Sequence, residues 1–87
     1  MKTREGIIAS QMGDECVLVP VGEAAKDIHG IVRLNETGSF IWNAITQGQE
    51  EQEIARRLTE EYEVELDTAL DAVRTLIARL KDAKLVE

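Results

Sequence analysis

The feature that most constrains the fold is the stretch from Gly30 to Trp42, which reads G-I-V-R-L-N-E-T-G-S-F-I-W. A short β-branched run stops at Asn35 and a helix begins, so the run is long enough only for an edge-sized strand. Asn35 suits the N-cap position because its side-chain oxygen can accept from free backbone N–H groups two or three residues on. Gly38 is a poor helix former at an interior position, costing about 1 kcal/mol against alanine. We therefore expect another part of the chain to pack closely against its backbone.

The length of 87 residues sets the size of the core. A chain of this length forms one domain, residues 1–87, which buries only somewhat over ~60% of its unfolded surface and has no room for a typical enzyme cleft. The single cysteine, Cys16, excludes an internal disulfide, and no leader of secretory type opens the chain. No apolar run approaches the ~20 residues that span a bilayer. We expect a cytoplasmic protein with no membrane partner.

The first third of the chain has the pattern of strands. Residues 7–12 and 15–21 are enriched in β-branched residues and are separated by Gly13-Asp14, a pair suited to a two-residue turn. These segments predict a β-hairpin. Residues 22–29 are a polar connection with room for one helical turn, and a third strand is expected over 30–34.

The rest of the chain repeats apolar residues at helical period, which predicts helices over about 35–47, 50–62 and 67–83. Gly48 is a natural C′ residue for the first of these helices. Before the third helix, we expect Val64 or Leu66 to fill the core and Asp67 to cap the helix. The element order predicts an α+β fold, a small winged helix-turn-helix-like domain with a three-stranded antiparallel sheet followed by three helices. The expected inward-facing residues are Ile41, Ala44, Ile45, Ile54, Ala55, Leu58, Tyr62, Leu70, Val73, Leu76, Ile77 and Leu80, with Phe40 or Trp42.

The net charge of −7 is concentrated in the middle of the chain. Residues 1–34 carry five acids and four bases, and residues 67–87 carry four of each. Residues 35–66 carry eight acids against only Arg56 and Arg57. Since a surface that binds phosphate backbones is basic, nucleic acid is not an expected partner. The acidic stretch is either a solvated face that keeps a small domain soluble or a surface for a basic partner protein.

Residues suited to catalysis are scarce. His29 is the only histidine, so the sequence offers no metal site with two imidazoles and no obvious Cys-His pair. Cys16 follows Asp14 and Glu15, whose charges oppose a reactive thiolate. Glycine-rich phosphate loops are absent. We therefore predict no catalytic residue, no metal site and no cofactor, which leaves a binding module.

The third predicted strand suggests what such a module binds. A short strand at the margin of a three-stranded sheet leaves one row of backbone donors and acceptors unpaired. An extended peptide can add to such an edge, where backbone hydrogen bonds give affinity, alternate side chains choose the sequence and an adjacent helix supplies an apolar wall. Ile31, Val32 and Leu34 also fit ordinary sheet packing. The two interpretations coexist because a strand has two faces besides its edge.

Several segments taken together carry a family resemblance. They are V-R-L-N-E-T-G-S-F-I-W at 32–42, E-I-A-R-R-L-T-E-E-Y at 53–62 and A-V-R-T-L-I-A-R-L at 72–80, with Gly48 and the terminal Leu85-Val86. The chain thereby resembles, over residues 7–86, the PqqD-like family of peptide chaperones, also called precursor-peptide recognition elements or RiPP recognition elements. The chain has Ala72 where this family commonly has an aspartate, and Lys84 where it often has a glycine.

The resemblance implies a winged-helix-like fold and a non-catalytic role. Family members bind the leader of a ribosomally made precursor peptide as an added strand and present it to a modifying enzyme, often a radical S-adenosylmethionine (SAM) enzyme, as in PQQ biosynthesis. It also implies a monomer or weak homodimer. Carried onto this chain, the peptide-binding residues are Gly30, Ile31, Val32, Arg33 and Leu34 on the strand, and some of Ala69, Leu70, Ala72, Val73, Arg74 and Leu76 on the last helix.

Two alternative functions remain from the pattern alone. A winged-helix DNA-binding regulator needs bases and amides near the start of its recognition helix, whereas residues 67–73, D-T-A-L-D-A-V, offer two acids and no base. A homo-oligomeric scaffold would use the same strand edge to pair with a second copy.

Overall fold

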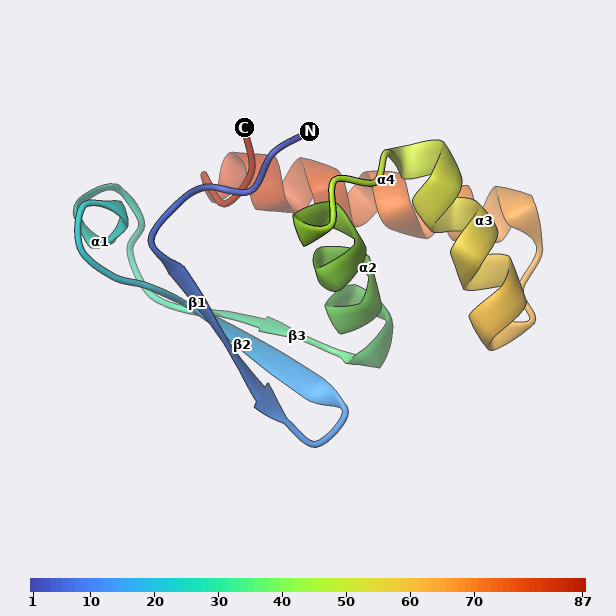
Figure 1. Ribbon diagram of the computed structural model, residues 1–87, viewed down its shortest axis with the longest axis horizontal. Coiled ribbons are helices and arrows are strands. Elements are labelled where there is room, and N and C mark those ends of the chain that lie inside the picture. Colours follow the sequence, from blue (N-terminus) through green and yellow to red (C-terminus); the bar gives the residue numbers. More distant parts are fainter.

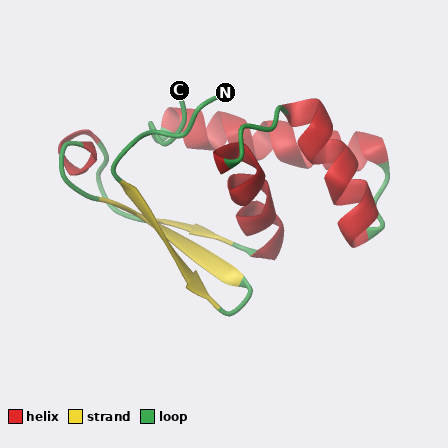
Figure 2. Cartoon of the chain, viewed as in Figure 1, coloured by secondary structure: helices red, strands yellow, loops and turns green.

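The sheet and the main helices occupy different parts of the molecule in a computed structural model that describes all residues, Met1–Glu87 (Figure 2). The elements are β1 (Ile7–Met12), β2 (Glu15–Pro20), α1 (Ala24–Asp27), β3 (Val32–Leu34), α2 (Glu36–Thr46), α3 (Glu51–Tyr62) and α4 (Leu66–Asp82). The strands form one antiparallel sheet in the order β1-β2-β3. This is the predicted α+β architecture, with α1 as the expected single turn. None of the helices has the length and apolar character needed to cross a membrane.

Two strands are shorter than predicted. β2 ends at Pro20, and the N–H of Val21 instead donates to the carbonyl of Gly6 at 2.7 Å. β3 begins only at Val32, so Gly30 and Ile31 precede the strand. Gly30 has a φ of 90°, a left-handed conformation that turns the chain just before the ladder. The third strand therefore has three residues rather than five.

The register of the sheet directs one face toward the helices. Met12 pairs with Glu15 across the two-residue turn, where Gly13 adopts a φ of 66°. On the other side of β2, Cys16 pairs with Leu34. The side chains of Cys16 and Leu34 are both buried in the core. The cysteine is a free, buried thiol, as expected for a structural residue of a strand.

The corner between β3 and α2 is built as the sequence predicts. The side-chain oxygen of Asn35 accepts a hydrogen bond from the Gly38 N–H at 2.8 Å, which caps the helix. A Cβ added at Gly38 would lie 3.3 Å from the Cβ of Leu34. The Asn35 side-chain oxygen would lie equally near, and both distances are tighter than ordinary van der Waals contact, so a side chain at this position would have to displace Leu34 or the cap slightly.

α2 ends at the expected glycine. Gly48 has a φ of 85° and its N–H donates to the carbonyl of Ile45 at 2.9 Å. The next N–H, that of Gln49, reaches back to the carbonyl of Ala44 at 3.1 Å. Together these bonds form a Schellman motif, which satisfies two carbonyls at the helix end.

α4 ends in the same motif, but a lysine holds the glycine position. Lys84 has a φ of 65°, its N–H donates to Lys81, and the N–H of Leu85 donates to the carbonyl of Leu80 at 2.8 Å. Leu80 and Leu85 are both fully buried. A residue with a Cβ is strained in this left-handed conformation. The lysine at position 84, where the family resemblance leads one to expect glycine, thus lies at a left-handed position that favours glycine.

The start of α4 differs from the prediction. The helix begins at Leu66, its N-cap residue is Glu65, and no side chain caps it, so the cap assigned to Asp67 is wrong. Val64 and Leu66 are exposed and do not fill the core. Glu63 has a φ of 53°, which reverses the chain directly after α3 and leaves the following residues at the surface.

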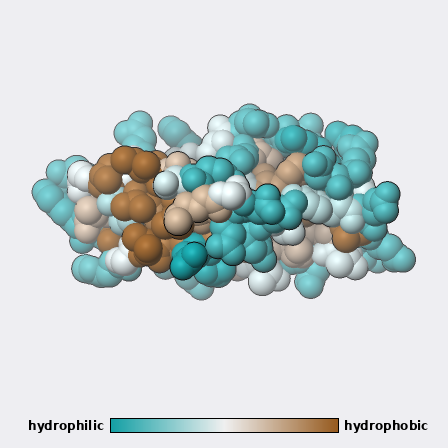
Figure 3. All heavy atoms as spheres, turned by 90° about the horizontal axis from the view of Figure 1, so that it is seen from below, coloured by the Kyte–Doolittle hydropathy of each residue, from teal (hydrophilic) through white to brown (hydrophobic).

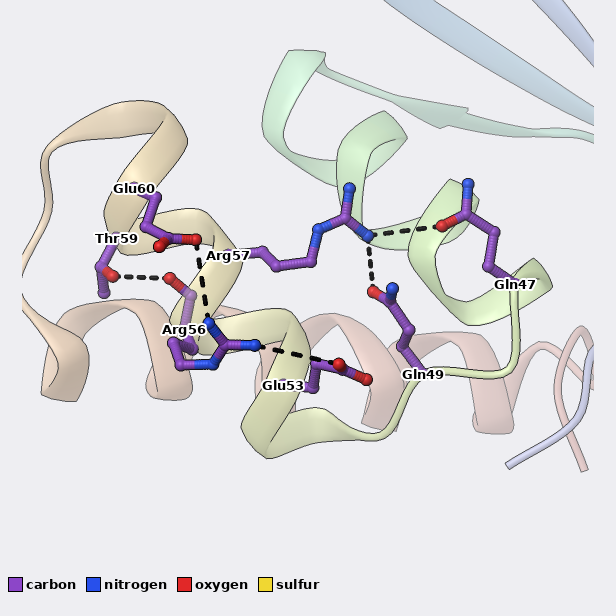
Figure 4. Close-up of polar contacts among 7 residues, drawn as sticks. All are labelled: Gln47, Gln49, Glu53, Arg56, Arg57, Thr59 and Glu60. Atoms are coloured by element: carbon purple, nitrogen blue, oxygen red, sulfur yellow. Dashed lines mark hydrogen bonds and ion pairs between the residues drawn. The ribbon is translucent and has the colours of Figure 1, made fainter.

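The core consists mainly of the predicted residues, including Trp42. Tyr62 and Leu70 are half-buried rather than fully enclosed. Phe40 is also half-buried and packs edge-on against Tyr62, with ring centroids 5.8 Å apart. The guanidinium of Arg57 lies over the Phe40 ring, 5.1 Å from its centroid. The same guanidinium donates to the side-chain amide oxygens of Gln47 and Gln49, so it ties α3 to the turn after α2 (Figure 4).

The two ends of the chain lie side by side (Figure 1). Thr3 and Val86 form an antiparallel bridge. It is flanked by hydrogen bonds from the Arg4 N–H to Leu85 and from the Glu87 N–H to Lys2. The C-terminal segment therefore pairs with the N-terminal segment and not with β3.

We expect replacement of Asn35 by alanine to lower the free energy of unfolding by about 1 kcal/mol, because the Gly38 N–H loses its partner. Asn35→Asp keeps an oxygen acceptor and should retain most of the stability. Urea unfolding followed by circular dichroism measures both. Equal midpoints for the alanine variant and the original protein would contradict the capping role.

Lys84→Gly should raise the free energy of unfolding by about 1 kcal/mol, because glycine adopts the left-handed conformation without the Cβ penalty. Lys81→Gly, a matched change within the last turn of α4, should instead lower it by about 1 kcal/mol. The same unfolding experiment compares the two. A loss of stability in both variants would show that the backbone strain at Lys84 is not relieved by glycine.

Candidate functional site

β3 has one open edge. β2 is its only neighbour in the sheet. Sixteen backbone hydrogen bonds lie outside the helices and strands, and none of them involves residues 30–34. The N–H and C=O groups on the outer side of β3 are therefore unpaired, which is the arrangement that accepts an added strand.

A groove runs between this corner of the sheet and α4. It consists of two hollows, of about 330 Å³ and about 320 Å³, which share Asn35, Gly38, Leu76 and Arg79. The first hollow reaches β2 and β3 and the second follows α4. The remaining lining residues are Glu15, Arg33 and Leu34 in the first hollow, and Thr37, Ile41, Ala72 and Thr75 in the second.

Of the strand residues predicted to bind the peptide, some line the groove and others do not. Arg33 and Leu34 line the first hollow. Val32 is half-buried and pairs with Leu18. Ile31, 60% exposed, and Gly30 lie before the strand.

The helical residues singled out from the sequence lie on different faces of α4. Ala72 and Leu76 line the groove. Val73 is fully buried in the core, and Arg74 forms an ion pair with Glu51 of α3 at 3.1 Å. Leu70 is half-buried against the core and lines none of the hollows. Val73, Arg74 and Leu70 thus do not belong to the groove.

Two residues of the α4 groove face were not selected from the sequence, Thr75 and Arg79. They follow Ala72 at spacings of three and seven, which places them on one helical face with Leu76. This spacing is visible in the sequence once Ala72 is taken as the reference position. The contributions of Glu15, Asn35 and Gly38 depend on the tertiary fold and have no such signal.

A third hollow of about 220 Å³ continues the groove toward the other end of α4. It shares Thr37 and Ala72 with the second hollow. Its other lining residues are Leu58, Tyr62, Val64, Thr68 and Ala69, so Ala69, also singled out from the sequence, lies here. Burial and then the negative charge of Glu36 raise the pKa of Tyr62 above its ordinary value of 10.0. The phenol is therefore uncharged at neutral pH, and this end of the groove is mostly apolar.

Apolar side chains are also exposed away from the groove, on β1 and directly beside β2 and β3. Ile8, Met12, Val21 and Ile31 are all at least 39% exposed. Brown side chains gather toward one end of the molecule in Figure 3, the end that carries α1 and much of the sheet. Since none of these four residues lines the groove, the exposed apolar side chains and the groove are distinct surfaces.

The fold and the open edge define the class of the protein, a winged helix-like α+β domain in which the last strand of the sheet lies beside a groove along the C-terminal helix. The chain belongs to the PqqD family, since the family described as coenzyme PQQ synthesis protein D (PqqD) matches residues 8–86. No curated protein matches the chain.

Two solved structures share this fold and contain a leader peptide. TbiB1 in complex with the TbiA(beta) leader peptide has a TM-score of 0.85 and 25% sequence identity, covering 100% of this chain and 95% of that one. Lasso peptide synthetase B1 complexed with the leader peptide has a TM-score of 0.77 and 27% identity, covering 93% of this chain and 89% of that one. Both similarities extend over nearly the whole domain.

Proposed function

We propose that this protein is a non-catalytic peptide chaperone that binds the leader of a ribosomally made precursor peptide and presents it to a separate modifying enzyme. The leader adds as a strand to the open edge of β3, and its side chains enter the groove along α4. The observation that carries the proposal is the unpaired edge of β3 beside that groove, in a chain whose solved relatives hold leader peptides.

The size of the edge argues for reversible binding. β3 has three residues, so it can form only a few backbone hydrogen bonds, each contributing about 0.5–1.5 kcal/mol net. Two or three apolar leader side chains add burial at about 25 cal/mol per Å². Together these terms fit micromolar affinity. Such a complex can release the leader after modification.

Two classes of enzyme are candidates for the partner. The first is a radical SAM enzyme, the partner that the family resemblance implies. The second is an enzyme of lasso peptide formation, since one similar solved structure is a lasso peptide synthetase B1. The acidic residues of α3 and its flanks, seven acids over 50–65, offer a docking surface for either. Purified enzyme of each class, encoded beside this gene, would be assayed on the precursor with and without this protein.

The matched variants Ala72→Trp and Ala78→Trp test the groove. Ala72 lines two of the three hollows, whereas Ala78 is exposed and lines none. Calorimetry with the leader of the precursor encoded beside this gene should show at least tenfold weaker binding for Ala72→Trp, because the indole fills the groove. Ala78→Trp should bind like the original protein.

Circular dichroism establishes that both tryptophan variants are folded. Unchanged leader affinity in a folded Ala72→Trp variant would refute the proposed groove. Light scattering and a mobility-shift assay at low salt test the competing functions, a self-pairing scaffold and a DNA-binding regulator.

A further inference from the structure

The groove has a cationic end, and we propose that the bound peptide places an acidic side chain there, held by Arg79 of α4 and Arg33 of β3. The inference rests on the proposed function and adds a sequence requirement to it. It specifies a peptide with a carboxylate at one fixed position and apolar residues elsewhere.

Arg79 is the first observation. It lines both hollows of the groove, and its guanidinium makes no hydrogen bond or ion pair, unlike the guanidiniums of the other five arginines of the chain. Arg56, for example, forms ion pairs with Glu53 and Glu60 of α3. Arg57 donates to Gln47 and Gln49 (Figure 4). The remaining partners are Asp27 for Arg4, Glu15 for Arg33 and Glu51 for Arg74. The one arginine without a partner is thus directed to the groove.

Arg33 is the second observation, because it already holds a carboxylate. Its guanidinium lies 3.3 Å from a carboxylate oxygen of Glu15, the only acidic residue that lines the groove. Both side chains are more than half exposed, so the ion pair contributes little free energy and exchanges easily. A peptide carboxylate can replace Glu15 and bind both guanidiniums at once, because each of its two oxygens can accept from a different arginine.

The start of α2 is the third observation. Asn35 and Gly38, from the cap and first turn of this 11-residue helix, line the first hollow beside the two arginines. The positive end of the helix dipole lies at the same space and favours an anion there, and Glu36 in the first turn offsets only part of it. Two guanidiniums and a helix N-terminus converge on this site, although the chain as a whole carries a net charge of −7.

The charge distribution gives this site a role in setting the register of the peptide. A three-residue strand specifies the alignment of an added strand only weakly, and a shift by two residues keeps the same side-chain face. An acidic side chain is attracted to the Arg33–Arg79 end and repelled by the acidic surface elsewhere. One carboxylate therefore fixes which residues of the peptide meet the apolar hollow near Tyr62.

A display library of random linear peptides tests the inference and does not require the natural leader. Peptides selected on the original protein should share an aspartate or glutamate at one position relative to their apolar residues. Selection on Arg79→Glu should lose that preference or replace it with lysine or arginine. Lys81→Glu changes the net charge equally, and Lys81 does not line the groove, so this variant should keep the acidic preference.

A selected peptide then allows a direct measurement. Exchange of its acidic residue for the matching amide should weaken binding to the original protein about tenfold, and should weaken binding to Arg79→Gln clearly less, because only Arg33 then remains to hold the carboxylate. Selected peptides that bind in the groove, as judged by loss of affinity with Ala72→Trp, but carry no acidic preference would overturn this inference and leave the proposed function standing. Selected peptides that are all insensitive to Ala72→Trp would overturn both.

Glu15→Gln provides an independent measurement, because it removes the internal competitor for Arg33. We expect the acidic peptide to bind this variant a few-fold more tightly, and the advantage should shrink at high salt. Equal or weaker binding of the acidic peptide to Glu15→Gln would contradict the exchange of one carboxylate for another.

Discussion

The close contact between Leu34 and Gly38 determines the geometry on which the rest of the molecule depends. Leu34 is the last residue of β3, and the backbone of α2 passes so near that a Cβ at Gly38 would lie 3.3 Å from the leucine. This contact lets the start of α2 lie directly against the end of β3. Leu34 and Gly38 both line the first hollow of the groove, together with Arg79 of α4. Gly38 therefore contributes both to the packing of this corner and to the lining of the candidate site.

Two features at the same corner protect the open edge of β3 from unwanted pairing. An unpaired strand edge invites aggregation in many proteins. Here β3 has only three residues and begins after the turn at Gly30, so the exposed row of backbone groups is short. Arg33 also places a charge on the strand itself, a common means of discouraging unwanted pairing. The edge is thus long enough for a peptide guest and poorly suited to extended self-association.

The sequence predicted those features that depend on local chemistry. The Asn35 cap and the glycine end of α2 follow from residue types whose backbone preferences are strong. The length of β3 was overestimated because β-branched residues do not reveal that Gly30 turns the chain. On α4, the groove face depends on how the helix is rotated against its neighbours. Ala72 and Leu76 were therefore selected together with Val73 and Arg74, which lie on other faces, whereas Thr75 and Arg79 were missed.

The bridge between Thr3 and Val86 has a consequence for how this domain can be combined with others. Because both ends emerge together, the domain can be inserted into a surface loop of a host protein, or circularly permuted, with little distortion of either partner. The attachment point is formed by the terminal segments rather than by β3. A genetic fusion to another protein through either end would therefore leave the strand edge accessible.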